Sequence, residues 1–246
     1  MFRKLAKLLR DPVGVLSRRW MTMVERLRFA GGGDYRTADY WNYRHGKYGF
    51  DLRGVGDKSK SHEENVKLLE QGSRVFLAVC REAKIPFRRA RVLDIGCGTG
   101  HFAEVLRNNG VKDYLGVDNV DTLFQGLHAR LPGFRFEQVD IATQRLRGTY
   151  DLIAAMDVLQ HIANEEKFAF ALENIRSHLA PSGTVVISTH LGPYRREAFY
   201  FIRRPLEAFQ KFFPGFAFST PVAYADSFVF SLRRNQKRAS AISSRR

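Results

Sequence analysis

The sequence predicts an α/β fold built on a mostly parallel sheet, and three observations support this. Short apolar runs alternate with amphipathic stretches from residue 90 onwards. The run VLDIGCGTG at 92–100 is an apolar segment that ends in a glycine-punctuated turn, with a helix beginning at about Thr99. Two β-rich runs close the chain. Strands separated by helices imply right-handed crossovers and a parallel sheet that is covered on both faces.

The alternation defines each element of this core. We expect strands at 91–95, 114–118, 134–139, 150–156 and 184–190, and helices at 100–109, 121–130, 164–179 and 194–212. The last two β-rich runs, 216–224 and 228–233, are joined by residues 225–227 and predict a short antiparallel hairpin. Pro221 is suited to an edge strand, where one amide hydrogen is dispensable.

The chain before the core is aromatic and then helical. Residues 34–60 are rich in Tyr, Trp and Gly and predict an ordered loop or a short helix at 38–45, followed by a loop. Residues 62–84 have a helical pattern that Pro86 closes. The inward positions expected on this helix are Val66, Leu69, Val75, Phe76 and Val79.

Residues 1–29 carry one apolar stripe at helical spacing, which Pro12 and Gly14 are expected to interrupt. The stripe consists of Phe2, Leu5, Leu9, Val13, Leu16, Trp20, Met23 and Leu27. Three interpretations remain open: a helix packed on its own domain or on a partner, a helix lying on an anionic membrane, and a mitochondrial-type targeting peptide. The three glycines at 31–33 predict a flexible joint after it.

Composition limits the class of protein. The chain has 246 residues, which suffices for one α/β domain with additions, and 44% hydrophobic with 26% charged residues is typical of a folded chain. Of the net charge of +15, residues 1–29 and 233–246 contribute +6 each, so the basic excess is not on the central body. Cys80 and Cys97 form neither a metal-ligand spacing nor a disulfide framework. With no apolar run near 20 residues, we expect a cytoplasmic protein, with peripheral membrane contact left open.

The glycine turn indicates the kind of ligand. Gly96, Gly98 and Gly100 take the first, third and fifth positions, whereas the dinucleotide fingerprint needs a glycine at the sixth, where this chain has His101. Glycine lets the backbone pass close to a nucleotide-like ligand. The next predicted strand ends at Asp118, 22 residues after Gly96, where a carboxylate can accept hydrogen bonds from both ribose hydroxyls.

Together with Asp94, which precedes the turn, these residues resemble motif I and the following acid of the class I S-adenosylmethionine-dependent methyltransferases. The resemblance covers about 90–234 and implies a Rossmann-like sheet of seven strands, mostly parallel, with a C-terminal antiparallel hairpin, helices on both faces and an N-terminal helical extension. We expect a basic amphipathic extension at 1–33, a cap and helix at 34–89, the methyltransferase domain at 90–234, and a basic, disordered tail at 235–246.

The resemblance implies S-adenosylmethionine as the cofactor and assigns residues to it. Asp94 would hold the methionine ammonium group, or else cap the loop amides. Asp118 and Asn119 would bind the ribose, and Asp140 the adenine amino group, with Ile141 against the ring. The further expected contacts are Gly96, Cys97, Gly98 and Gly100 in the turn, and Met156 and Asp157 after the fourth strand.

The acceptor residues are less defined. His161 and His190 are candidates for a general base or a substrate contact, although His161 also suits a residue that supports its loop. Trp41 and Tyr43 would fold over the cofactor or the acceptor, or pack as a cap. Tyr194 and Arg195 fall where acceptor specificity resides in such enzymes, and arginines there suit an anionic substrate or a solvated helix face. No carboxylate pair follows the fourth strand in the pattern of a magnesium site, so we expect no metal.

The predicted function is methyl transfer to an oxygen or nitrogen atom of a small molecule, including a membrane-proximal lipid or glycoside. Two alternatives remain open: an RNA methyltransferase that uses its basic ends, and a cofactor-binding scaffold without turnover. Nucleic acid is the less favoured partner because the basic excess lies at the ends of the chain.

Overall fold

The structure, a computed structural model, describes residues 12–58 and 60–235. Within them one eight-stranded sheet has the order β10-β12-β7-β6-β3-β4-β5, with β11 beside β12. Its parallel strands are β3 (Arg91–Ile95), β4 (Asp113–Asp118), β5 (Arg135–Gln138), β6 (Tyr150–Met156) and β7 (Leu179–Thr189). β12 (Ser227–Arg234) runs antiparallel to β7. The predicted α/β fold with a mostly parallel, Rossmann-like sheet is therefore confirmed.

The end of the chain differs from the predicted hairpin by one strand. The run 216–224 forms two short strands, β10 (Phe216–Phe218) and β11 (Val222–Tyr224), and both pair with β12. The break lies at 219–221, where Pro221 has no amide hydrogen for the ladder. There the Ser219 hydroxyl accepts a hydrogen bond from the Ser231 amide instead (2.9 Å).

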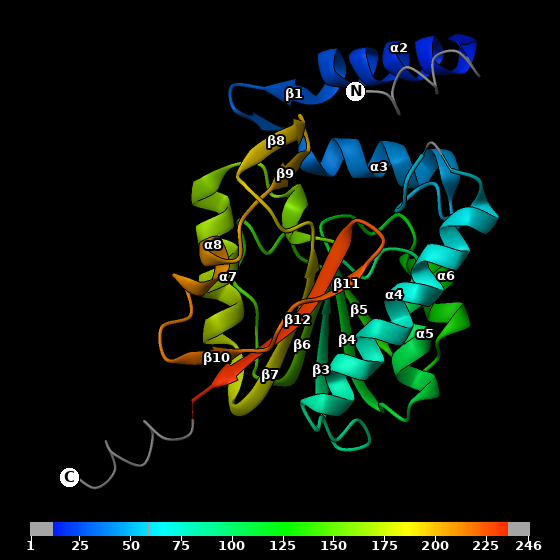
Figure 1. The fold of residues 1–246 in the computed structure, drawn as a ribbon. Helices are drawn as coiled ribbons and strands as arrows, with labels where there is room; N and C mark the ends of the chain where they lie inside the picture. The colour runs from blue at the N-terminus through cyan, green and yellow to red at the C-terminus, as the bar shows by residue number, and fades with distance from the viewer. Residues whose placement is uncertain (1–11, 59, 236–246) are drawn as a thin grey trace, which may run out of the picture.

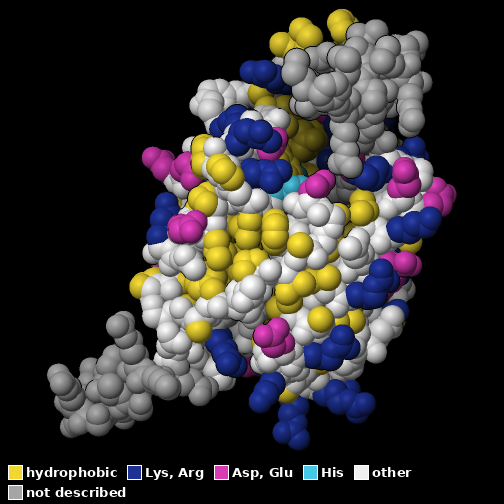
Figure 2. All heavy atoms as spheres, viewed as in Figure 1, with side chains coloured by type: hydrophobic (Ala, Val, Ile, Leu, Met, Phe, Trp, Pro, Cys, Tyr) yellow, Lys and Arg dark blue, Asp and Glu magenta, His cyan; other side chains and the backbone are white. Residues whose placement is uncertain are grey.

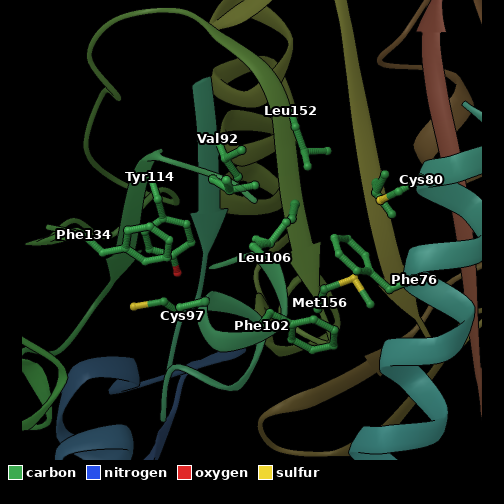
Figure 3. Packing of buried hydrophobic residues seen from close by; sticks show 14 of the residues in the cluster. Phe76, Cys80, Val92, Cys97, Phe102, Leu106, Tyr114, Phe134, Leu152 and Met156 are labelled. Carbon is green, nitrogen blue, oxygen red and sulfur yellow. The ribbon is translucent and has the colours of Figure 1, made fainter. Parts of the chain in front are cut away.

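Helices cover both faces of the sheet (Figure 1). α4 (His62–Glu82), α5 (His101–Asn108) and α6 (Phe124–Arg130) pack on one face, and α7 (Glu165–Ser177) and α8 (Glu207–Gln210) on the other. Strand residues alternate between the two cores. Leu93 packs on the α7 side, whereas Val92 packs with Phe76 and Leu106 on the α4 and α5 side (Figure 3). α4 begins with the capping box Ser61–Glu64.

The predicted helix at 194–212 is wrong over most of its length. Residues Arg195–Ala198 and Phe201–Arg203 form the antiparallel strands β8 and β9, and only Glu207–Gln210 is helical. Pro205 excludes a continuous helix here. Phe199 and Ile202 instead bury their side chains in a cluster with Tyr40.

A layer of N-terminal elements lies across the carboxyl ends of the parallel strands (Figure 1). It comprises α2 (Pro12–Phe29), the hairpin β1 (Ala30–Gly31) with β2 (Asp34–Tyr35), and α3 (Thr37–Tyr48). Gly14 does not interrupt α2, contrary to expectation, and Pro12 is the first residue of this helix that the structure describes. The predicted joint at 31–33 forms the turn of the β1–β2 hairpin. The first part of the stripe, up to Leu9, lies outside the described residues.

No helix among the described residues is long and apolar enough to cross a bilayer.

Candidate active site

A cavity of about 840 Å³ lies between the carboxyl ends of the parallel strands and the N-terminal layer. Figure 2 shows a hollow in this part of the surface, with hydrophobic side chains in its depth and Lys and Arg side chains around it. We call its two sides the floor and the roof. The floor consists of lining residues at 95–99, 118–119, 139–141 and 156–162. The roof consists of lining residues in α2, α3 and 55–60.

The glycine turn forms the centre of the floor. The Gly96 amide donates to the Val117 carbonyl (2.7 Å), which holds the turn against β4. Gly96 has a φ of +68°, a conformation that side chains disfavour. A Cβ atom there would lie 2.3 Å from Val158 Cγ2. The turn therefore needs glycine for both conformation and space.

Asp118 ties the turn to the end of β4. Its carboxylate accepts hydrogen bonds from the Gly98 amide (3.0 Å) and from the Val120 amide (3.3 Å). Burial raises the pKa of Asp118 to about 6, although these backbone amides oppose the shift. Each carboxylate oxygen can accept a further hydrogen bond, and the residue lines the cavity. The predicted ribose contact is therefore available to a ligand.

Asp94 is placed differently from the other predicted contacts. It is buried, it does not line the cavity, and its carboxylate accepts a hydrogen bond from the Tyr114 hydroxyl (2.7 Å). Burial raises its pKa to about 7, against the effect of the Tyr114 bond. Asp94 thus lies beneath the turn. The other predicted cofactor residues that line the cavity are Gly96, Cys97, Gly98, Asn119, Asp140, Ile141, Met156 and Asp157, whereas Gly100 packs over Leu127.

Asp157 fixes the far end of the floor. It has a φ of +57°, unusual for a residue with a side chain. Its carboxylate accepts hydrogen bonds from Ser188 (2.6 Å), Ser227 (3.0 Å) and the Tyr224 hydroxyl. These donors come from β7, β12 and β11. The sequence analysis missed them because no motif connects serine and tyrosine residues so far apart in the chain.

His161 is the floor residue that contacts the aromatic rings packed around Tyr40, namely Trp41 and Tyr200. Its Nδ1 is 3.0 Å from the Tyr200 carbonyl, and because a carbonyl only accepts, Nδ1 carries the ring proton and Nε2 keeps its lone pair. Burial lowers the pKa of His161 to about 4, against the effect of this bond. The ring is therefore neutral at pH 7. The Trp41 indole lies edge-on to it, with ring centroids 5.1 Å apart.

His190 also lines the cavity, with its ring edge-on to Phe201 at 4.8 Å. Burial lowers its pKa, and the negative charge of Asp157 opposes the shift. Both predicted histidines are thus brought to the same cavity. His161 is the one whose tautomer is fixed by a hydrogen bond.

The structure does not bring three of the four predicted acceptor residues to the cavity. Trp41 lines it, but Tyr43 packs against Phe29 at 5.5 Å between ring centroids. Tyr194 is 56% exposed and donates to Glu165, and Arg195 pairs with Glu197 on the surface. For Tyr194 and Arg195 the reason is the β8–β9 hairpin, which replaces the expected helix, whereas Tyr43 lies on α3 and packs there against Phe29. Lining residues that sequence analysis did not assign include Arg44, His45, Gln160, Tyr200 and Phe201.

The segment that forms the floor lies within the part of the chain that matches a known protein family. A model described as "Methyltransferase domain" matches residues 68–219, which include the whole floor. The chain belongs to this methyltransferase family. The resemblance seen in the glycine turn is thereby confirmed.

Relatives of this methyltransferase-family chain share only part of their length with it. A trans-aconitate 2-methyltransferase of Variovorax paradoxus is 35% identical over 108 residues, which cover 43% of this chain and 40% of the relative. A ubiquinone biosynthesis O-methyltransferase of Rickettsia prowazekii is 28% identical over 107 residues, covering 41% and 40%. The chain thus matches about two fifths of each relative's length.

Solved structures share the fold more completely. The magnesium protoporphyrin IX methyltransferase of Synechocystis PCC 6803 with bound SAM has a TM-score of 0.60 and 19% identity, and the match covers 80% of this chain and 95% of that one. At this identity the match supports the fold of the methyltransferase-family chain.

Proposed function

We propose that this protein transfers a methyl group from S-adenosylmethionine to an oxygen or nitrogen atom of a small molecule. The observation that carries the proposal is the hydrogen bond between the Gly98 amide and the Asp118 carboxylate, inside one cavity. It places the bare backbone of the turn beside a strand-end carboxylate, which suits a ligand with both an amino-acid part and a ribose. Membership of the methyltransferase family supports the same ligand.

The residues on the floor fit this cofactor. The cavity, at about 840 Å³, has the size of pockets that hold small-molecule ligands. Gly96 lets the turn pack directly against Val158, so that both segments line the same side of the cavity. Asp118 would accept from the ribose, and Asp140 with Ile141 would hold the adenine. When bound, the cofactor supplies a methyl group on a sulfonium, already activated for displacement.

The chain's own part is alignment and proton removal. The floor and roof would hold the two reactants side by side in one cavity, and alignment of this kind supplies most of what a direct displacement needs. The His161 Nε2 lone pair can accept the proton of a hydroxyl or amine acceptor, because Nδ1 is held by the Tyr200 carbonyl. A neutral ring at pH 7 is the form that this role requires.

The test is transfer of label from S-adenosylmethionine to fractionated cell extract, together with calorimetry of S-adenosylhomocysteine. We expect saturable binding and label in the small-molecule fraction. Label in RNA would support the RNA methyltransferase alternative, and binding without any product would support a scaffold. An absence of binding heat with folded protein would contradict the proposal.

The exposed face of α2 supports an acceptor at a membrane surface. Trp20, Met23, Val24 and Leu27 lie at helical spacing and are 44–76% exposed, whereas Glu25 and Phe29 on the opposite face are buried. Exposed Arg26 and Arg28 border the apolar stripe. Apolar side chains flanked by arginines complement an anionic lipid surface. Since Glu25 lines the cavity, a lipid layer on the outer face of α2 would lie close to the cavity mouth.

Vesicle sedimentation tests this part of the proposal. Replacing both Trp20 and Leu27 by Ser removes about 1.5–3 kcal/mol of burial for each side chain, so binding to phosphatidylglycerol vesicles should fall at least tenfold. Val222→Ser is the matched control, because Val222 is also exposed (40%) but lies on β11. Unchanged sedimentation of the double variant would exclude α2 as the membrane contact.

A further inference from the structure

The lining of the cavity, chiefly its roof, holds buried polar atoms that lack hydrogen-bond partners. Among the described residues, seven buried side-chain nitrogen or oxygen atoms have no hydrogen-bond partner, and four of them belong to cavity-lining residues. These four are Arg44 Nε, His45 Nδ1, His45 Nε2 and Gln160 Oε1. A buried polar atom without a partner costs free energy that a bound ligand can recover. The cluster therefore indicates a polar group of a ligand at this place.

Arg44 is the charged member of the cluster. It is 2% exposed, and no carboxylate among the described residues pairs with it. Arg204, which is equally buried at 1%, contrasts with it because its guanidinium pairs with Glu165 at 2.7 Å. A buried cation without a counter-charge is unfavourable. A ligand anion would supply the missing charge for Arg44.

The guanidinium of Arg44 is held in place before any ligand binds. Its Nη2 donates to the carbonyls of Arg53 (2.6 Å) and Gly56 (2.9 Å), and its Cζ atom lies 5.1 Å from the centre of the Trp41 ring. Both carbonyl bonds use the same nitrogen. Nε and Nη1 therefore keep N–H groups for an acceptor, each as a single charged donor, because both bidentate forks of a guanidinium include Nη2.

His45 lies next to Arg44 and also lines the cavity. It is 3% exposed and neither ring nitrogen has a partner, so one N–H is available for donation. Burial and the charge of Arg44 lower its pKa to about 4, which keeps the ring neutral at pH 7. One fixed positive charge and one neutral donor suit a singly charged anion better than a dianion.

We propose that Arg44 and His45 form a carboxylate-binding subsite in the cavity roof, an inference that rests on the proposed function. Two carboxylates have access to this cavity: that of the methionine part of the cofactor, and that of an acidic acceptor. The charge of Arg44 also lowers the pKa of His161, so the subsite lies within electrostatic reach of the candidate base. The Trp41 ring also connects the two, because Arg44 Cζ lies 5.1 Å from its centre and the His161 ring is edge-on to it at 5.1 Å.

Two ligands and one transfer assay separate these sources. S-adenosylhomocysteine carries the amino-acid carboxylate and 5′-methylthioadenosine lacks it, so calorimetry of both on the wild type and Arg44→Met measures the contact. If the cofactor's carboxylate is bound, the variant loses about 10–100-fold in affinity for the first ligand and nothing for the second. If the acceptor's carboxylate is bound, both affinities stay unchanged. Label transfer to extract compounds retained on an anion-exchange resin then falls at least tenfold.

His45→Phe keeps the test independent of folding. The ring retains its size and loses two unpartnered nitrogens, so the melting temperature should stay the same or rise, whereas the affinity or transfer that Arg44→Met affects should fall about 3–10-fold. Arg91→Met is the matched control. Its Nε is also buried without a hydrogen bond, but Arg91 pairs with Asp113 at 3.7 Å and lies on β3 at the end opposite the cavity, so its replacement should change neither affinity.

The outcomes separate the subsite from the proposed function. Wild-type protein that binds neither ligand and transfers no label would refute the proposed function. Wild-type binding and transfer that remain unchanged in both Arg44→Met and His45→Phe would overturn the subsite alone. An equal loss of affinity for both ligands in Arg44→Met, without any effect of His45→Phe, would also overturn it. That pattern would mean that Arg44 only holds the 53–56 loop in place through its hydrogen bonds to the Arg53 and Gly56 carbonyls.

Discussion

The floor and the roof of the cavity are built from opposite chemistry. The floor offers bare backbone and carboxylates, with Asp118 and Asp157 as its hydrogen-bond acceptors. The roof offers aromatic rings and more cations than carboxylates, with the Arg44 Cζ atom 5.1 Å from the centre of the Trp41 ring. An acceptor-rich floor suits hydroxyl and ammonium donors, and a cationic roof suits an anion. The difference in charge means that one cavity can bind a donor-bearing group at its floor and an anionic group at its roof.

The largest expected effect on the floor is that of a side chain at Gly96, where Val158 leaves no room for one. Gly96→Ala places a Cβ atom 2.3 Å from Val158 Cγ2 and forces a side chain into φ +68°. Strain and overpacking together cost about 2–5 kcal/mol, which the turn can relieve only by leaving its present conformation. Because binding would have to restore that conformation, affinity for S-adenosylhomocysteine should fall at least 30-fold. Gly133→Ala is the control, since Gly133 has φ +87° but nothing within 4 Å of a Cβ atom. Calorimetry showing equal affinities for both variants would mean that the turn does not approach the ligand.

The floor was also the part that the sequence predicted. Gly96, Gly98 and Asp118 were assigned from one glycine-rich run and the next strand, because the carboxyl ends of neighbouring parallel strands meet at one edge. These assignments needed only neighbouring residues in the sequence and no contacts between distant segments. The placement of Asp94 was not predictable in this way, since its hydrogen bond to Tyr114 depends on which side of β3 it faces.

The roof could not be predicted from local patterns. Arg44 lies in the aromatic stretch 40–44, but its lack of a carboxylate partner depends on how α3 packs against the 53–56 loop. The acceptor role expected for Tyr194 and Arg195 assumed a helix that the structure replaces by β8 and β9. Pro205 was the signal against that helix. Packing between segments more than 100 residues apart, such as Tyr40 on Tyr200 at 4.8 Å, decides this side of the cavity.

Removing the floor carboxylate is the next largest expected effect. Asp118→Ala deletes the acceptor for the ribose and leaves the Gly98 amide without its partner, so affinity for S-adenosylhomocysteine should fall by about 1–3 kcal/mol, or 5–150-fold. Asp113→Ala is matched to it, because Asp113 lies at the other end of β4 and pairs with Arg135 on the surface. An unchanged dissociation constant for Asp118→Ala would remove this residue from the ligand site.

The same carboxyl group predicts a pH dependence. Burial raises the pKa of Asp118 to about 6, and only the ionised form offers all its lone pairs to ribose hydroxyls. Affinity for S-adenosylhomocysteine should therefore be constant above pH 7 and about tenfold weaker at pH 5. The effect on stability has the opposite sign, because a raised folded pKa adds stability at low pH that is lost as the pH rises through 6. Isothermal titrations of wild type and Asp118→Asn from pH 5 to 8 check this, and a persistent pH slope in the variant would assign it to another group.

The smallest expected effect concerns how the roof is held closed. Lys58 pairs with Glu25 at 2.5 Å, with the two side chains 23% and 10% exposed, and this pair joins α2 to the loop that carries part of the roof. Because it is less exposed than most surface pairs, Glu25→Gln should cost about 1 kcal/mol. The expected result is faster hydrogen exchange in α2 and a few-fold faster release of S-adenosylhomocysteine, with the core strands unchanged. Arg26→Gln, on an exposed position of the same helix, should change neither rate. If Glu25→Gln leaves exchange in α2 unaltered, the helix is held instead by Phe29, which is 2% exposed and packs edge-on against Tyr40 at 5.5 Å.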